Sequence, residues 1–152
     1  MDSETSAFWQ DFLQKTGRPP DTAPYEIFHF CMTEELANGL LGLVLDGKKT
    51  AATSSLPLYE TAGQRPPRPG DLSVVTDWAG APRCVIETTA VRTMPFNEMT
   101  YEICKREGED DTLESWQQGH ARVFTEEGAQ EGYAFSPEMP IVFEDFKVVW
   151  RR

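Results

Sequence analysis

The stretch Gly47-Lys48-Lys49-Thr50-Ala51-Ala52-Thr53-Ser54-Ser55 lies where a predicted helix ends and a predicted strand begins. An apolar helical pattern over residues 36–45 comes before it and stops at the glycine. Adjacent ammonium groups repel each other, and cations are scarce in a chain with a formal net charge of -11. A lysine pair beside several hydroxyl groups therefore predicts a site for an anionic or polar ligand. The alternative is a solvated turn after a helix C-cap, where cations suit the helix dipole.

Length and composition predict one globular unit without a membrane segment. The 152 residues are 39% hydrophobic and include 9 Phe, 4 Trp and 4 Tyr, enough for a sizeable core. The three cysteines are far apart and form no metal-binding or redox spacing, which predicts a reduced, cytoplasmic setting. No apolar run approaches the roughly 20 residues of a membrane span, and no secretory signal pattern is present.

The charge distribution excludes one class of partner. Asp and Glu outnumber Lys and Arg by 25 to 14. A protein that binds duplex DNA needs a basic face, so we expect no duplex DNA partner. A small anion or a short single strand suits the local basic surface that the sequence allows, which comprises Lys48, Lys49, Arg65, Arg68, Arg83 and Arg92.

The first half of the chain predicts helices on either side of short strands. An N-terminal helix and linker over residues 1–24 precede the main domain, residues 25–152. After a strand over 25–32, Thr33 is a good N-cap for a helix whose apolar face carries Leu36, Leu40, Leu43 and Val44. Residues 50–58 are expected to be extended, and residues 72–77 and 83–93 to form a hairpin.

The second half predicts a helix over residues 98–106, an acidic loop over 107–111 and a further helix. Asp111 and Glu114 have capping-box spacing at the start of that helix, and Trp116 and His120 lie on its apolar face. A loop over 126–137 and two strand pieces, 141–144 and 146–150, complete the chain. The predicted fold is α+β, a half-closed barrel of mostly antiparallel strands flanked by helices.

Four motifs in this order resemble the ASCH domain family of PUA-like β-barrels, in a bacterial branch. They are Gly47-Lys48-Lys49-Thr50, Pro69-Gly70-Asp71, the run from Glu107 to Trp116 followed by His120, and Ile141-Val142-Phe143-Glu144. The resemblance covers residues 25–150. It implies an RNA- or nucleoside-related role, because some members are amidohydrolases on N-acetylated cytidine and others are described as single-stranded RNA nucleases.

The amidohydrolase pattern implies a lysine, a threonine three residues later and a glutamate in the acidic segment. Lys49 and Glu109 match the first and the last. The threonine position falls on Ala52, which leaves Thr53 and Thr50 as the neighbouring hydroxyls. A threonine hydroxyl is a nucleophile only when a base takes its proton, and Lys49 would be that base. Glu109 would then pass a proton to the leaving amine.

RNA cleavage would use the same residues differently. Lys49 would stabilise charge on the phosphate, and Glu109, Asp111 or His120 would accept the 2′-hydroxyl proton. We expect no cofactor and no metal site, with a divalent cation held by two acids as the alternative. Trp78 or Tyr59 would stack a base. The predicted ligand-binding residues are Lys48, Ser54, Ser55, Trp78, Asp111, Trp116 and His120.

The sequence thus favours an ASCH protein that binds RNA or a nucleotide-like ligand in a cleft beside residues 47–50, with single-stranded RNA cleavage as its activity. Two alternatives stay open. One is the amidohydrolase, and the other is a non-catalytic interaction module in which Trp116 and His120 belong to the core.

Overall fold

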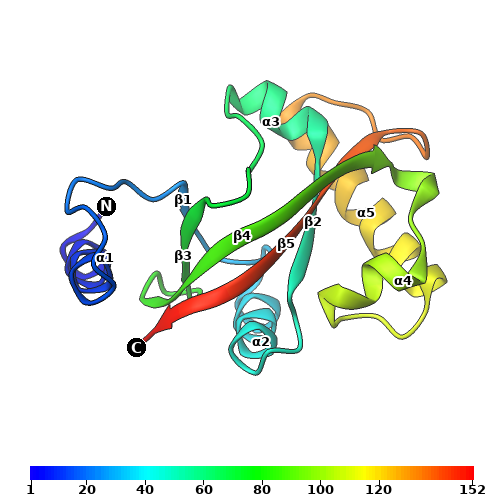
Figure 1. Cartoon of the computed structure of the whole chain (residues 1–152). Coiled ribbons are helices and arrows are strands. Elements are labelled where there is room, and N and C mark those ends of the chain that lie inside the picture. The colour runs from blue at the N-terminus through cyan, green and yellow to red at the C-terminus, as the bar shows by residue number, and fades with distance from the viewer.

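The computed structural model describes residues 1–152 and contains one curled sheet with helices around it (Figure 1). The strands are β1 (Glu26–Phe28), β2 (Ala51–Ser55), β3 (Leu72–Thr76), β4 (Pro82–Pro95) and β5 (Pro140–Arg151). The helices are α1 (Ser3–Lys15), α2 (Glu34–Leu45), α3 (Leu56–Ala62), α4 (Tyr101–Cys104) and α5 (Leu113–Glu131), with 3₁₀ turns η1 (Phe96–Glu98) and η2 (Lys105–Glu107). None of the helices combines the length and the apolar character that a membrane crossing requires.

The strand order is β1-β3-β4-β5-β2, with β1 parallel to β3 and every other pair antiparallel. The two long strands, β4 and β5, run the length of the sheet (Figure 1). Their pairing shifts register between Val85 and Ile86 and between Thr88 and Ala90. Because a bulge bends its strand and increases the local twist, these shifts curl the sheet into a half-barrel. The predicted α+β half-barrel is confirmed.

Helix α1 packs its aromatic side on strands β3 and β4. Phe8, Trp9 and Phe12 form a buried cluster with Val74 and Val85. The indole Nε1 of Trp9 also donates a hydrogen bond to the Thr22 carbonyl at 2.8 Å, which fixes the linker against the helix. The boundary that we expect between residues 24 and 25 lies just before β1 and stays a prediction.

Helix α2 begins where predicted but turns a different face inward. The Thr33 hydroxyl accepts a hydrogen bond from the Leu36 amide at 3.3 Å, as an N-cap does. The buried residues are Ala37, Leu41 and Val44, whereas Leu36 is 54% exposed. The predicted face was wrong at Leu36 because the helix packs through Leu41 and Val44 on a cluster of sheet residues, Val75, Cys84, Ile86 and Phe146.

Four other predicted boundaries were wrong, the first being that of the strand over 25–32, of which only Glu26–Phe28 forms β1. The extended stretch over 50–58 ends at Ser55, because Pro57 lies in the first turn of a short helix, α3. The residue that caps α5 is Thr112, not Asp111, and its hydroxyl accepts from the Ser115 amide at 3.1 Å. The loop predicted over 126–137 starts only after Glu131 in the structure, because α5 continues to that residue.

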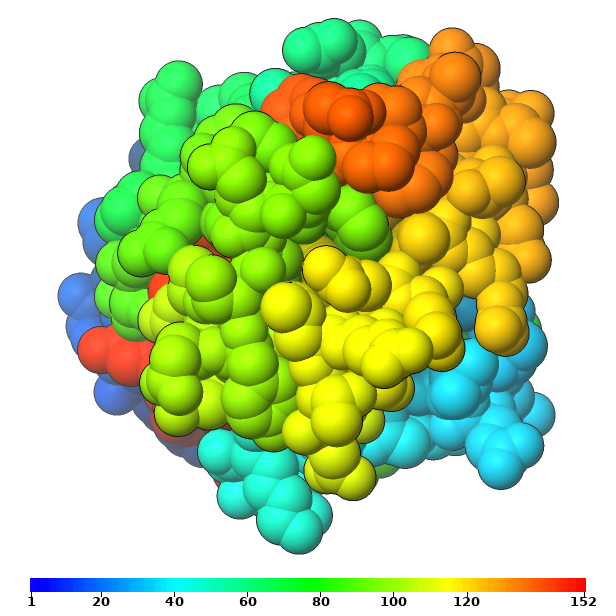
Figure 2. All heavy atoms as spheres, turned by 90° about the vertical axis from the view of Figure 1, so that its right-hand side faces the viewer, coloured from blue at the N-terminus to red at the C-terminus, as the bar shows by residue number.

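Segments η1 to α5 cover the face of the sheet that carries Ile141 and Phe143. The helix predicted over 98–106 is divided into η1, α4 and η2. The predicted strand pieces 141–144 and 146–150 are one continuous strand, β5. Figure 2 looks onto this face, with η1 to α5 in yellow-green to orange and α2 in cyan at the lower right. Trp116 and Phe124 lie at the centre of the cluster under these segments.

Candidate functional site

The junction between α2 and β2 is held by the backbone on both sides. Gly47 has a φ of 77°, which lets the chain reverse after α2. The Lys48 and Lys49 amides both donate to the Leu43 carbonyl, at 2.9 and 3.1 Å. The Thr50 amide then donates to the Arg106 carbonyl at 2.9 Å, which attaches the junction to η2.

Gly108 brings the acidic segment against this junction. Its φ of 71° is left-handed, and a Cβ at this position would overlap the Lys48 carbonyl oxygen. Only glycine therefore allows the two backbones to approach so closely. Glu107 and Glu109, on either side of Gly108, consequently lie beside Lys49.

The Lys49 side chain is buried between these two carboxylates. Its Nζ lies 2.5 Å from Glu109 Oε2, 3.8 Å from Glu107 Oε1 and 2.8 Å from the Ala51 carbonyl oxygen, to which it donates. The Phe30 ring covers it at 5.6 Å. The side chain of Lys49 is 2% exposed, whereas that of Glu109 is 26% exposed. Glu109 is thus the member of the pair that solvent reaches.

Glu107 is the buried centre of a hydrogen-bond network. Its Oε2 accepts from the Thr53 hydroxyl at 2.9 Å and from Trp116 Nε1 at 2.5 Å. Its Oε1 lies 3.5 Å from His120 Nε2. Burial by itself raises the pKa of Glu107, but the hydrogen bond from His120, the charges of His120 and Lys49 and the bond from Trp116 together lower it. Glu107 therefore stays ionised although it is buried.

His120 lies flat against Trp116, with ring centroids 4.3 Å apart, and Nδ1 lies 3.0 Å from the Trp116 carbonyl oxygen. Burial by itself lowers the pKa of His120. The hydrogen bond to Glu107 and the charge of that carboxylate outweigh burial, so the pKa is raised.

The structure thus brings together five of the predicted site residues. They are Lys49, Thr53, Glu109, Trp116 and His120. Glu107 and Phe30, which the sequence analysis left without a role, join them. The signal for Glu107 was present in the sequence, because two glutamates flank the same glycine; nothing in the pattern marked Phe30.

Other predicted residues point elsewhere. Trp78 is 38% exposed, and the centroid of its ring lies 4.9 Å from that of His29. Its backbone amide donates a hydrogen bond to Asn38 Oδ1. Ser55 donates to Glu127 at 2.8 Å, beside the Tyr133 hydroxyl.

The remaining polar positions have no contact with the Lys49 side chain. Thr50 is exposed and its hydroxyl donates to the Arg106 carbonyl at 3.2 Å. Lys48 and Asp111 are exposed and form no ion pair, and Ser54 lies near Tyr59. Ala52 packs on the cluster under α2 while Thr53 faces Glu107, so the two positions lie on opposite faces of β2.

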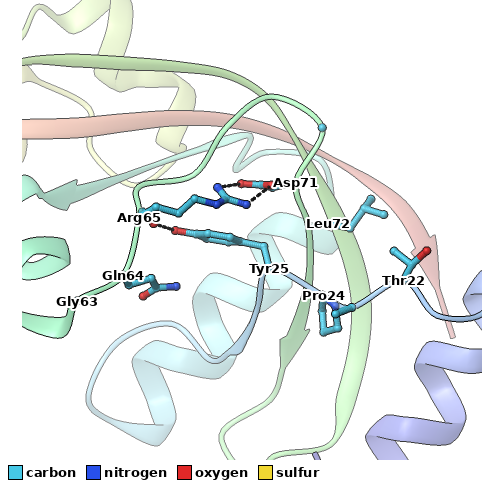
Figure 3. A pocket seen from close by; sticks show the side chains of 10 residues that line it. Thr22, Pro24, Tyr25, Gly63, Gln64, Arg65, Asp71 and Leu72 are labelled. Atoms are coloured by element: carbon cyan, nitrogen blue, oxygen red, sulfur yellow. Dashed lines mark hydrogen bonds and ion pairs between the residues drawn. The ribbon is translucent and has the colours of Figure 1, made fainter.

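Two of the five surface pockets are lined by residues of the predicted motifs. One of about 320 Å³ is lined by Gly47, Lys49 and Thr50 with residues of α2 and β5, but by neither glutamate. The other, of about 510 Å³, lies between the start of β1 and the loop after α3 (Figure 3). There the Arg65 guanidinium lies over the Tyr25 ring, 4.6 Å from its centroid, and donates two bonds of 2.8 Å to Asp71.

The Lys49 cluster is a stronger candidate site than the larger pocket, because it holds buried charges, a network and a reachable carboxylate. No group of three or more His, Cys, Asp or Glu side chains is arranged to hold a metal ion.

Comparison with known proteins agrees with this fold. A family model described as the ASCH domain matches residues 26–150. A crystal structure of a protein from Enterococcus faecalis V583 shares 34% identity, with a TM-score of 0.92, over 99% of this chain and 91% of that chain. The crystal structure of an ASCH domain from Lactobacillus crispatus JV V101 shares 33% identity, with a TM-score of 0.90, over 99% of this chain and 97% of that one. No curated protein matches the chain. This chain belongs to the ASCH domain family.

Proposed function

We propose that this ASCH domain hydrolyses an amide on a nucleoside-like ligand, with N-acetylated cytidine as the substrate that the family resemblance suggests. The observation that carries the proposal is the 2.5 Å contact between the buried Lys49 ammonium and the partly exposed Glu109 carboxylate. A carboxylate held in this way is placed to move protons at a surface that a ligand reaches.

The charges favour an uncharged, polar ligand over a phosphate. Lys49 lies between Glu107 and Glu109, which offset its charge. Of the other cations in the predicted basic surface, Arg65 is paired with Asp71. Because an anion would have to compete with these carboxylates, an acylated nucleoside fits the cluster better than a nucleotide phosphate.

The reaction needs one water molecule and no cofactor. Glu109 takes a proton from the water while the water oxygen bonds to the acyl carbon. The carbon–nitrogen bond then breaks, and Glu109 returns the proton to the leaving amine, which releases acetate and the free amine. Lys49 holds Glu109 in position. The Thr53 hydroxyl is directed at Glu107, which supports water in place of threonine as the nucleophile.

The experiment is incubation of the purified protein with N-acetylated cytidine and measurement of released acetate. Glu109→Gln keeps the shape of the side chain and removes its base, so we expect kcat to fall about 100- to 10,000-fold. Glu126→Gln, on the exposed side of α5, is the matched control and should retain full activity. Acetate release that survives Glu109→Gln, or no release by the unmodified protein, contradicts the proposal.

Binding of single-stranded RNA, with cleavage, is the second candidate. The exposed Lys48 side chain, which forms no ion pair, favours it, because its ammonium is accessible to a phosphate. A single-stranded RNA oligonucleotide should then shorten with time, and a chelator would distinguish a metal-dependent from a metal-independent reaction. RNA that stays intact and unbound refutes this candidate.

A further inference from the structure

The two oxygens of Glu107 have different kinds of partner. Oε2 is occupied by two neutral donors, the Thr53 hydroxyl and the Trp116 indole. Oε1 faces two cationic side chains, His120 at 3.5 Å and Lys49 at 3.8 Å. Lys49 is closer to Glu109, at 2.5 Å, so the two cations are divided between the two carboxylates.

The surroundings of His120 require protons on both ring nitrogens. Nδ1 faces the Trp116 carbonyl oxygen at 3.0 Å and Nε2 faces the Glu107 carboxylate. Both partners only accept hydrogen bonds, and a neutral imidazole donates from one nitrogen alone. Either neutral tautomer would therefore direct a lone pair at an oxygen. Glu109, whose charge also acts on the ring, favours the imidazolium too.

We propose that His120 is a positioning residue: its imidazolium occupies Glu107 Oε1 and so leaves the Lys49 ammonium to hold Glu109. This inference rests on the proposed hydrolysis for its kinetic consequence, but not for the charge of His120. With His120 charged, Lys49 and His120 balance Glu107 and Glu109. The side chain of His120 is 17% exposed and acts through Glu107, so it needs no contact with the substrate.

Loss of the imidazolium would change the partner of Lys49. In H120Q the buried Glu107 keeps its charge only if Lys49 moves toward it, because a buried carboxylate without a cation is costly. Glu109 would then lose the ammonium that holds it. Removing the charge of Glu107 as well, in E107Q/H120Q, cancels this competition and returns Lys49 to Glu109.

The charge of His120 can be measured without any activity. The chain has 2 histidines, so in the H29Q variant the only histidine-ring NMR signals are those of His120. We expect these signals to titrate at a pH above the usual histidine range, around 6.5, and the ring nitrogens to show the imidazolium form at neutral pH. Titration at or below that range overturns the inference.

The kinetic arm measures acetate release from N-acetylated cytidine. We expect H120Q to lower kcat about 100-fold with a smaller change in KM, as misplacement of a reacting group does. E107Q/H120Q should recover at least about 10-fold of that loss, because charge balance is restored. His29 is exposed and outside the cluster, so H29Q is the control.

An H120Q variant with the kcat of H29Q overturns the inference, and so does a double variant no more active than H120Q. Absence of acetate release from the unmodified protein refutes the proposed hydrolysis instead. The NMR titration uses no substrate, so the two failures are distinguishable.

Discussion

Replacing Lys49 by methionine tests how strongly the buried ammonium holds the site together. The variant keeps most of the side-chain volume but removes the cation from Glu109, at 2.5 Å, and from Glu107, at 3.8 Å. Removing one partner of a buried pair costs about 3–5 kcal/mol. Glu109 is partly exposed and gains hydration in the variant, and Glu107 keeps His120, so we expect the lower end, about 3 kcal/mol of unfolding free energy. For a chain of this length that loss lowers the melting temperature by about 6–12 °C.

The assay is chemical and thermal unfolding at neutral pH, followed by circular dichroism. Lys48→Met is the matched control, because Lys48 is the adjacent residue and is exposed without an ion pair. Its free energy of unfolding should stay within about 0.5 kcal/mol of the unmodified protein. Equal stability of the two variants would refute the reasoning, since it would mean that the Lys49 contacts contribute no more than a solvated lysine.

Two more predictions concern stability. Gly108→Ala should cost more than about 2 kcal/mol in chemical unfolding, because its Cβ meets the Lys48 carbonyl oxygen. Gly63→Ala, equally left-handed but with open space around it, should cost only about 1–2 kcal/mol; equal losses would contradict the close approach. Burial, with neighbouring carboxylates, raises the pKa of Glu26 to about 7. Between pH 4.5 and pH 7 the native state therefore keeps a proton on Glu26 that the unfolded chain has released. The free energy of unfolding consequently falls as the pH rises through this range. Glu26→Gln should therefore raise the melting temperature at pH 8 and much less at pH 4. The exposed control Glu60→Gln should show no such dependence on pH. An equal effect of Glu26→Gln at both pH values would contradict the prediction.

Much of the fold was predictable because local patterns and tertiary packing agree. The Thr33 cap, the glycine after α2 and the β-branched hairpin strands each specify one local structure, and all three are present. The prediction failed where long-range packing decides, as for the face of α2. Helix α2 carries leucine or valine at positions 36, 40, 41, 43, 44 and 45, so several of its faces look alike in the sequence. Only the sheet residues opposite determine which face is buried.

The candidate site was predictable in part, where local sequence motifs mark its residues. The motifs marked Lys49 and Glu109, which are 60 residues apart, and the fold joins them at one place. No sequence pattern shows that Glu107 accepts from Trp116 and faces His120, because those contacts depend on how η2 approaches α5. Only its residue type marks Trp78 as a stacking residue, and in the fold its ring lies against His29 instead.

The most direct test of the proposed site is a kinetic double-variant cycle on Lys49 and Glu109, with release of acetate from N-acetylated cytidine as the readout. If the two residues act as one unit, the Lys49→Met/Glu109→Gln variant should lose no more kcat/KM than the worse single variant, since the second change removes nothing further. Losses that multiply, within about twofold, would show two independent residues and contradict the proposed pair.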